Sequence, residues 1–214
     1  MNAYEKARRE FDRDRGNVAV KALRANRMEA LLLEDKEEAR QYLVNAIDRE
    51  KTVAFGDSLT LREVGIFQAL EERGQKVVNP FRIPGQDDIE AMYEVFNCYY
   101  YLTGSNAVTL DGKILCVDAI GNRVAPMFFG PKEVFIVAGV NKLVDNLEDG
   151  RRRIKEFAAP VNARRLGKGT PCTTLPKCAD CSHETRICNV EVILHKKPRF
   201  TKVTVLLINE SLGL

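Results

Sequence analysis

One apolar segment constrains the fold of this 214-residue chain more than any other feature. EVFIVAG, residues 133–139, carries apolar residues at consecutive positions instead of alternating ones. A strand of this kind is buried on both faces, which is typical of the centre of a parallel sheet covered by helices. The segment therefore predicts an α/β fold with a mainly parallel sheet.

Strand and helix patterns alternate before this segment. TVAF, residues 52–55, predicts a buried strand that ends at Gly56, and residues 60–74 predict the helix that follows. Thr60 and Glu63 have the spacing of a capping box, which would start that helix. Asp111-Gly112 lies between AVTL and KILCVD and predicts a hairpin with a two-residue turn.

The patterns continue after it. A helix is expected to open at Asp145 and to kink or split at Pro160, and residues 191–195 and 202–209 predict two closing strands. Together the elements predict a single domain from residue 26 to residue 214. Residues 1–25 predict a charged helical extension that packs on the body or on a partner.

Charge and hydropathy exclude several classes of partner. The chain has 33 basic and 30 acidic residues, a net charge of +3 that argues against a nucleic-acid partner. Basic clusters at 151–153, 163–168 and 195–202 are interpreted as solvated faces. The chain starts without the apolar core of a signal peptide, and no apolar run approaches the roughly 18 residues of a membrane helix. We expect a cytoplasmic protein with no membrane partner. The sequence leaves open whether the protein forms a homo-oligomer.

Polar loops follow two of the predicted strands. Gly56, Ser58 and Thr60 form the first, where backbone N–H groups and hydroxyls at a helix start would bind phosphate or carboxylate. Asp57 would repel such an anion, and the same residues could simply cap the helix. The second group of candidate ligand-binding residues is Thr103, Gly104, Ser105 and Asn106 with Gly121, Asn122 and Arg123.

Asp118 and Arg123 are the candidate catalytic residues. Arg123 could hold a carboxylate or phosphate with two parallel hydrogen bonds, and Asp118 could act as a general base or orient Arg123. A structural pairing of the two side chains is the alternative. Two histidines give no support for a Ser-His-Asp triad, and the sequence contains neither a Walker A motif nor G-x-G-x-x-G.

Four of the six cysteines lie within one short loop, residues 169–188. Cys172, Cys178, Cys181 and Cys188 have the spacing C-x5-C-x2-C-x6-C, and prolines and polar residues between them favour a wrapping loop. Four thiolates suit a [4Fe–4S] cluster or a tetrahedral zinc, and the spacing does not decide between the two. Disulfides or unmodified thiols are the remaining alternatives.

Several segments carry a family resemblance. GDSLTLREVG, YLTGSNAVTLDGKILCVDAIGNRVAPMFFGPKEVFIVAGVNKLV and AAPVNARRLGKGTPC, followed by RICN and VILHKKP, resemble the lactate-utilisation (LUD) domain family. The likeness extends from about residue 15 to the end. Its most specific part is the TGSNA…DG…D…GNRVA run, and the cysteine tail looks like that of a stand-alone subgroup.

The resemblance implies a fold and a setting. The fold would be a Rossmann-like three-layer sandwich similar to the NagB/RpiA/CoA-transferase superfamily, with phosphate or CoA bound near Gly56, Ser58 and Thr60. Asp57 departs from the family pattern, which usually has glycine there, and Ala119-Ile120 stands where glycines are common. The resemblance implies that the protein is a component of a system that oxidises L-lactate or a similar hydroxy acid. Its partners would be iron–sulfur oxidoreductases.

Two other functions remain open at this point. One is a transferase or isomerase for an acyl-CoA or sugar phosphate with a structural zinc, for which Glu63 is the only placed nucleophile. The other is a non-enzymatic module that responds to a ligand or to redox state.

Overall fold

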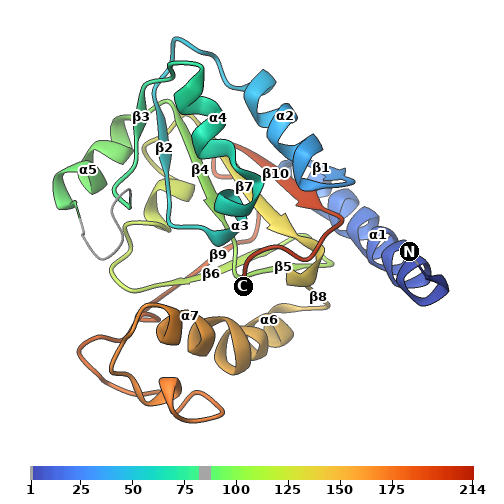
Figure 1. Ribbon diagram of the computed structural model, residues 1–214, viewed down its shortest axis with the longest axis vertical. Coiled ribbons are helices and arrows are strands. Elements are labelled where there is room, and N and C mark those ends of the chain that lie inside the picture. The colour runs from blue at the N-terminus through green and yellow to red at the C-terminus, as the bar shows by residue number, and fades with distance from the viewer. Residues whose placement is uncertain (1, 82–87) are drawn as a thin grey trace.

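The computed structural model describes residues 2–81 and 88–214 and contains one large parallel sheet (Figure 1). Its six strands have the order β1-β10-β7-β4-β2-β3, and every neighbouring pair is parallel. The strands are β1 (Glu29–Leu33), β2 (Val53–Phe55), β3 (Val77–Val78), β4 (Tyr100–Gly104), β7 (Glu133–Gly139) and β10 (Lys202–Ile208). The all-apolar segment is β7, between β10 and β4, so its predicted place inside a parallel sheet is confirmed.

A second sheet has four strands in the order β8-β5-β6-β9. They are β5 (Ala107–Thr109), β6 (Ile114–Asp118), β8 (Leu143–Val144) and β9 (Val190–Leu194). The hairpin predicted at Asp111-Gly112 joins the antiparallel strands β5 and β6. Gly112 has a positive φ of 79° and packs against the end of the first helix, where a Cβ would lie 2.5 Å from the Ala22 carbonyl carbon. The two closing strands belong to different sheets, because β9 pairs with β6 and β10 with β1 and β7.

Helices cover both faces of the large sheet. The described helices are α1 (Ala3–Ala25), α2 (Lys36–Ala46), α3 (Leu59–Val64), α4 (Ile66–Glu72), α5 (Ile89–Glu94), α6 (Leu147–Arg153) and α7 (Ala159–Arg165). Side chains of β7 alternate between two cores: Ile136 packs with α1 and the small sheet, and Phe135 packs with α2, α3 and α4. The helices α6 and α7 cover the small sheet, and the cysteine loop lies beside α7 (Figure 1). This is the predicted Rossmann-like α/β sandwich.

The N-terminal helix is part of this body. Gly16, Ala19, Val20 and Leu23 of α1 are buried, and three of them belong to the core beneath β1 and β10. The predicted helical segment therefore packs on the body. No helix among the described residues is both long and apolar enough to span a bilayer.

One predicted helix is broken where the sequence pattern indicated no break, and a second is split close to the proline that predicted a kink or split. The helix expected over residues 60–74 is broken at Gly65, whose φ is 72°, into α3 and α4. Its N-cap is Ser58, whose Oγ accepts a hydrogen bond from the Leu61 amide, so the capping box assigned to Thr60 is wrong. Further along, a π-helical turn, Ile154–Ala158, separates α6 from α7, and Pro160 lies in the first turn of α7.

Candidate functional site

The two polar loops predicted from sequence meet at the carboxyl edge of the large sheet. Gly56 follows β2, and Ser105 follows β4, its neighbour in the sheet. The chain leaves β2 toward the outer strand β3, but leaves β4 toward β7 on the opposite side. Adjacent strands with divergent connections form a topological switch point, where open α/β sheets bind ligands. We call this region the strand-end site.

Two glycines allow the loops to approach one another closely. A Cβ on Gly56 would stand 2.9 Å from both Thr103 Oγ1 and Arg123 Cγ, and a Cβ on Gly104 would stand 2.6 Å from Ser58 Oγ. Neighbouring side chains fill the space that a Cβ would need, so only glycine fits at these two positions. The structure brings together Gly56, Ser58, Thr103, Gly104 and Arg123, as the sequence suggested.

Arg123 is held by carbonyl and amide oxygens. Its Nη2 donates to Val117 O at 2.6 Å and to Asn106 Oδ1 at 3.3 Å. The Tyr101 hydroxyl donates to the Arg123 carbonyl at 2.8 Å, and burial raises the pKa of that hydroxyl. The Arg123 guanidinium makes no ion pair within the described residues; burial disfavours its charge, but the neighbouring Cys116 and Asp118 favour it, and the pKa of Arg123 is raised.

Asp118 has a different geometry from the one expected. Its carboxylate accepts hydrogen bonds from the amides of Ala119, Arg123 and Val124, at 2.8, 2.9 and 3.1 Å. It contacts the backbone of Arg123 and thereby shapes the loop that carries this arginine. The orienting role proposed for Asp118 fits this arrangement better than the role of a general base. Gly121, with φ 94°, and the partly exposed Asn122 lie in the same loop, at its surface.

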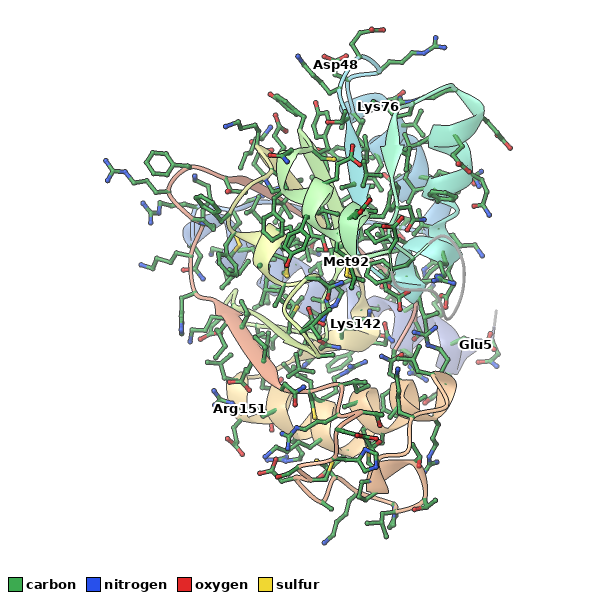
Figure 2. All side chains as sticks on the ribbon, turned by 90° about the vertical axis from the view of Figure 1, so that its left-hand side faces the viewer. Glu5, Asp48, Lys76, Met92, Lys142 and Arg151 are labelled. Atoms are coloured by element: carbon green, nitrogen blue, oxygen red, sulfur yellow. The ribbon has the colours of Figure 1, made fainter. Side chains whose placement is uncertain are left out.

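Lys142 also belongs to the strand-end site, although the sequence did not indicate it. It ends the 3₁₀ turn Val140–Lys142, which directly follows β7 (Figure 2). Only 4% of this lysine is exposed. Its Nζ donates to Thr60 Oγ1 at 2.8 Å, the one hydrogen bond of this amine among the described residues. Burial, reinforced by the charges of Arg153 and Arg123, lowers the pKa of Lys142 to about 7. The available signal was a lysine that, beside Asn141, interrupts the apolar residues at the end of the central strand.

Arg153 is a second cation of the site that the sequence pattern did not indicate. The cluster 151–153 was interpreted as a solvated face, which is correct for Arg151, paired with Glu191, and Arg152, paired with Asp149. Arg153 instead points inward, where it donates to Asn106 O at 2.7 Å and Asn141 O at 3.2 Å. Burial lowers its pKa.

Hydroxyl and carboxylate groups complete the electrostatics of the site. Ser105 is buried, and its Oγ has no hydrogen-bond partner in the described part of the chain. Asp57, expected to repel an anion, lies 2.9 Å from Arg62 and 3.1 Å from Arg165. Two arginines therefore compensate its negative charge, and the local balance favours an anion.

The four clustered cysteines surround one small cavity. Cys172, Cys178, Cys181 and Cys188 line a volume of about 20 Å³ together with Pro160 and Arg186. No group of three or more His, Cys, Asp or Glu side chains within residues 2–81 and 88–214 is arranged to hold a metal ion. All six cysteines of the chain are free thiols. The loop thus gathers four soft donors around one point without a closed coordination geometry.

Arg186 stabilises the cysteine loop by joining parts of its backbone. Its guanidinium donates to the carbonyls of Cys181 and Cys188 and pairs with Asp180 at 2.9 Å. Burial raises the pKa of the Cys188 thiol, and the nearby Arg186 charge opposes that effect.

One helical segment connects the two regions. Arg153 at the end of α6 enters the strand-end site, Pro160 of α7 lines the cysteine cavity, and Arg165 at the end of α7 pairs with Asp57.

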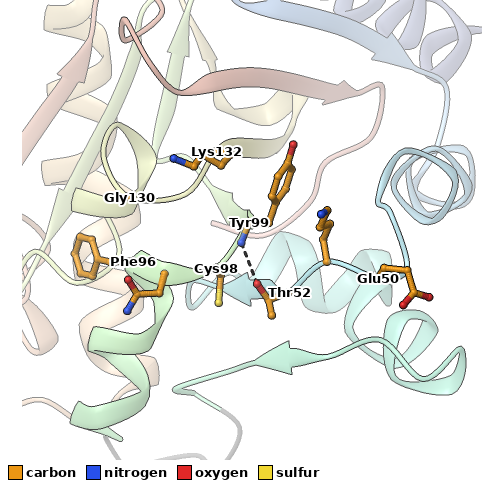
Figure 3. Close-up of a pocket in the computed structure, with 9 residues that line it drawn as sticks. Glu50, Thr52, Phe96, Cys98, Tyr99, Gly130 and Lys132 are labelled. Atoms are coloured by element: carbon orange, nitrogen blue, oxygen red, sulfur yellow. Dashed lines mark hydrogen bonds between the residues drawn. The ribbon is translucent and has the colours of Figure 1, made fainter.

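A separate hollow of about 440 Å³ lies at the opposite edge of the large sheet (Figure 3). Residues preceding β2, β4 and β7 line it, among them Thr52, Tyr99 and Lys132. Thr52 Oγ1 accepts a hydrogen bond from the Tyr99 amide at 3.0 Å. Because it opens at the amino ends of the strands, this hollow is distinct from the strand-end site.

Comparison with solved structures supports the fold. A crystal structure of a DUF162 family protein from Deinococcus radiodurans is 12% identical, with a TM-score of 0.53, over 94% of this chain and 98% of that chain. A crystal structure of eIF2B beta from Chaetomium thermophilum is 16% identical, with a TM-score of 0.30, over 64% of this chain and 44% of that one, a likeness too weak to support an argument.

The remaining comparisons concern sequence. No curated protein matches the chain. The family model described as the LUD domain matches residues 16–208, which include the second half of α1, both sheets and the cysteine loop. The chain therefore belongs to the LUD domain family.

Proposed function

We propose that this protein binds a small carboxylate at the strand-end site and is a component of the utilisation of L-lactate or a similar hydroxy acid. One observation carries the proposal: the side-chain cations of Arg123, Lys142 and Arg153 gather there, and none of them forms an ion pair with a carboxylate within 4.0 Å among the described residues. Lys142 is buried, and Arg123 and Arg153 are partly buried. Cations withdrawn from water are normally paired, so an anionic ligand is the group that this arrangement lacks.

The ligand class follows from the donors. A guanidinium binds a planar carboxylate with two parallel hydrogen bonds, and hydroxyls such as those of Ser58 and Ser105 suit the hydroxyl or oxo oxygen of a small acid. Inorganic phosphate shares the charge and much of this hydrogen-bonding capacity. The binding experiment must therefore compare both kinds of anion.

Isothermal titration calorimetry with L-lactate, D-lactate, pyruvate and inorganic phosphate tests the proposal. We expect the small carboxylates to bind more tightly than phosphate, and Arg153→Met to weaken binding by about tenfold, the loss of one charged hydrogen bond. Arg152→Met, a change at the exposed neighbouring arginine, is the matched control. Equal affinity of both variants for lactate would contradict the proposal.

We further propose that the cysteine loop holds an iron–sulfur cluster, with zinc as the alternative. The residues fit such a group in number and chemistry, because four thiols line one cavity beside the cationic Arg186. A bound cluster would supply one-electron transfer, and oxidoreductase partners containing iron–sulfur centres would exchange those electrons. Free thiols suit the reducing cytoplasm, where we place the protein.

Metal analysis of anaerobically purified protein distinguishes these cofactors. Iron and sulfide with a broad absorption band near ~400 nm would identify a cluster, whereas one zinc without colour would assign a structural role. Cys178→Ser is expected to lower the metal content, and Cys98→Ser, at a buried cysteine outside the loop, is expected to leave it unchanged. Protein without metal before any mutation would contradict both cofactors.

No specific observation favours the transferase alternative. Glu63, its candidate nucleophile, accepts a hydrogen bond from the Gly213 amide at 3.1 Å. A transferase for acyl-CoA or sugar phosphate would need this carboxylate to be released from that contact.

A further inference from the structure

Lys142 is a titratable group in an unusual setting, because its amine is buried without a carboxylate partner among the described residues. A buried lysine that serves only stability normally has a carboxylate partner, because an unpaired ammonium is costly to bury. Lys142 has one neutral partner, Thr60 Oγ1, and no carboxylate within 4.0 Å among the described residues. The exposed Lys202 offers a contrast, since it lies between Glu29 and Glu133, which raise its pKa.

The groups around Lys142 favour the uncharged amine. Arg153 and Arg123 disfavour an ammonium, and Glu63 and Cys116 oppose them only in part. With a pKa of about 7, about half of the Lys142 side chains are free amine at neutral pH. An ordinary lysine with a pKa of about 10.4 has only about one molecule in 2,500 in that form. A free amine is nucleophilic, and an ammonium is not.

We propose that Lys142 is a nucleophilic lysine that forms an imine with the carbonyl carbon of a small 2-oxo carboxylate. The inference rests on the proposed carboxylate site, because Arg153 would hold the carboxylate of the same ligand. It also gives that site a function for the product of hydroxy-acid oxidation, which is a 2-oxo acid.

The chemistry balances without an oxidant or reductant. The Nζ lone pair attacks the carbonyl carbon to give a carbinolamine, and both amine protons leave with the former carbonyl oxygen as water. A C=N bond replaces the C=O bond, and hydrolysis reverses the step. Thr60 is a positioning residue here, since its hydroxyl, 2.8 Å from Nζ, fixes the direction of the amine.

A short segment near the end of the chain covers this amine. Leu212 O lies 3.4 Å from Thr60 Oγ1, and a Cβ on Gly213 would lie 3.3 Å from Lys142 Nζ. Leu212 is buried, and its amide donates to Asn141 Oδ1 at 3.1 Å. This segment limits the access of bulk water to Lys142, which favours an imine over its hydrolysis. The segment must shift to admit a ligand.

Reductive trapping tests the inference. Full-length protein is incubated with pyruvate and sodium cyanoborohydride near neutral pH, and the modified residue is identified by peptide mass spectrometry. We expect one reduced adduct per chain, on Lys142, formed at least about tenfold faster than at any exposed lysine. The adduct should be absent from Lys142→Met and retained in Lys155→Met, a change at an exposed lysine of the π-helical turn. Mapping on the unmutated protein identifies the site even if a variant fails to fold.

The outcomes separate this inference from the proposed function. Calorimetric binding of pyruvate and lactate without trapping would overturn the imine and leave the carboxylate site standing. Adducts distributed over exposed lysines would overturn it as well. Trapping at Lys142 by acetaldehyde and pyruvate at equal rates would support a reactive lysine and contradict the carboxylate site.

Discussion

Replacement of Lys142 by methionine tests the electrostatics of the strand-end site through stability alone. Methionine keeps the length and flexibility of the side chain and removes its charge. Burial lowers the pKa of Lys142 from 10.5 to about 7, a difference of about 3.5. At about 1.4 kcal/mol for each pH unit, the folded protein bears a penalty of about 5 kcal/mol when this amine is charged.

The way in which the free energy of unfolding changes with pH follows from proton binding by Lys142. Between pH 7 and 10.5 the unfolded chain holds the Lys142 proton more tightly than the folded chain does. The free energy of unfolding should therefore rise with pH across this window and carry the full penalty below it. Loss of the hydrogen bond to Thr60 costs about 1 kcal/mol, so Lys142→Met should be more stable than the parent by about 3 to 4 kcal/mol near pH 6.

Urea unfolding followed by circular dichroism at several pH values measures this difference. The advantage of the variant should shrink as the pH rises toward 10, and subtraction of the two curves cancels the other groups that titrate there. Lys155→Met is the exposed control and should show no such trend. If Lys142→Met is less stable at every pH, or if the difference does not depend on pH, the reasoning is refuted.

Three further changes test the packing of the site and of the cysteine loop. Gly104→Ala should lower the free energy of unfolding by about 2 kcal/mol, measured by urea unfolding, since the new Cβ meets Ser58 Oγ at 2.6 Å. Asp118→Asn should lower it by about 2 kcal/mol and weaken carboxylate binding, because one of three amide hydrogen bonds is lost; unchanged calorimetry would contradict an orienting role. Arg186→Met should slow alkylation of Cys188 by iodoacetamide, because the arginine lowers the pKa of that thiol, and an unchanged rate would show that this charge has no effect.

Local patterns were sufficient for much of the fold. The β7 strand, the Asp111-Gly112 hairpin and the break at Pro160 each depend on a few consecutive residues, and each is present in the structure. The break at Gly65 was missed, since a glycine inside a helical pattern is usually tolerated there. The assignment of Thr60 as the cap failed because Ser58, two residues earlier, has a hydroxyl that can cap a helix equally well.

The strand-end site was only partly predictable. Gly56, Thr103 and Arg123 were identified because polar loops after neighbouring parallel strands gather at one edge. Lys142 and Arg153 were not, because a lysine after a strand and an arginine in a basic run are usually solvated. Their burial depends on the second sheet and on α6, whose positions no local pattern specifies.

The sequence by itself determined the element types, the family resemblance and the gathering of four thiols in one loop, because these depend on residues close together in the chain. Only the tertiary structure decided how distant charges meet. Asp57 pairs with the distant Arg165, and Lys142 is buried against Thr60. These contacts join residues far apart in the chain and depend on the order of the strands and on the placement of α7. The pKa of a group depends on burial and on neighbouring charges in space, so the unusual amine of this protein is a property of its fold.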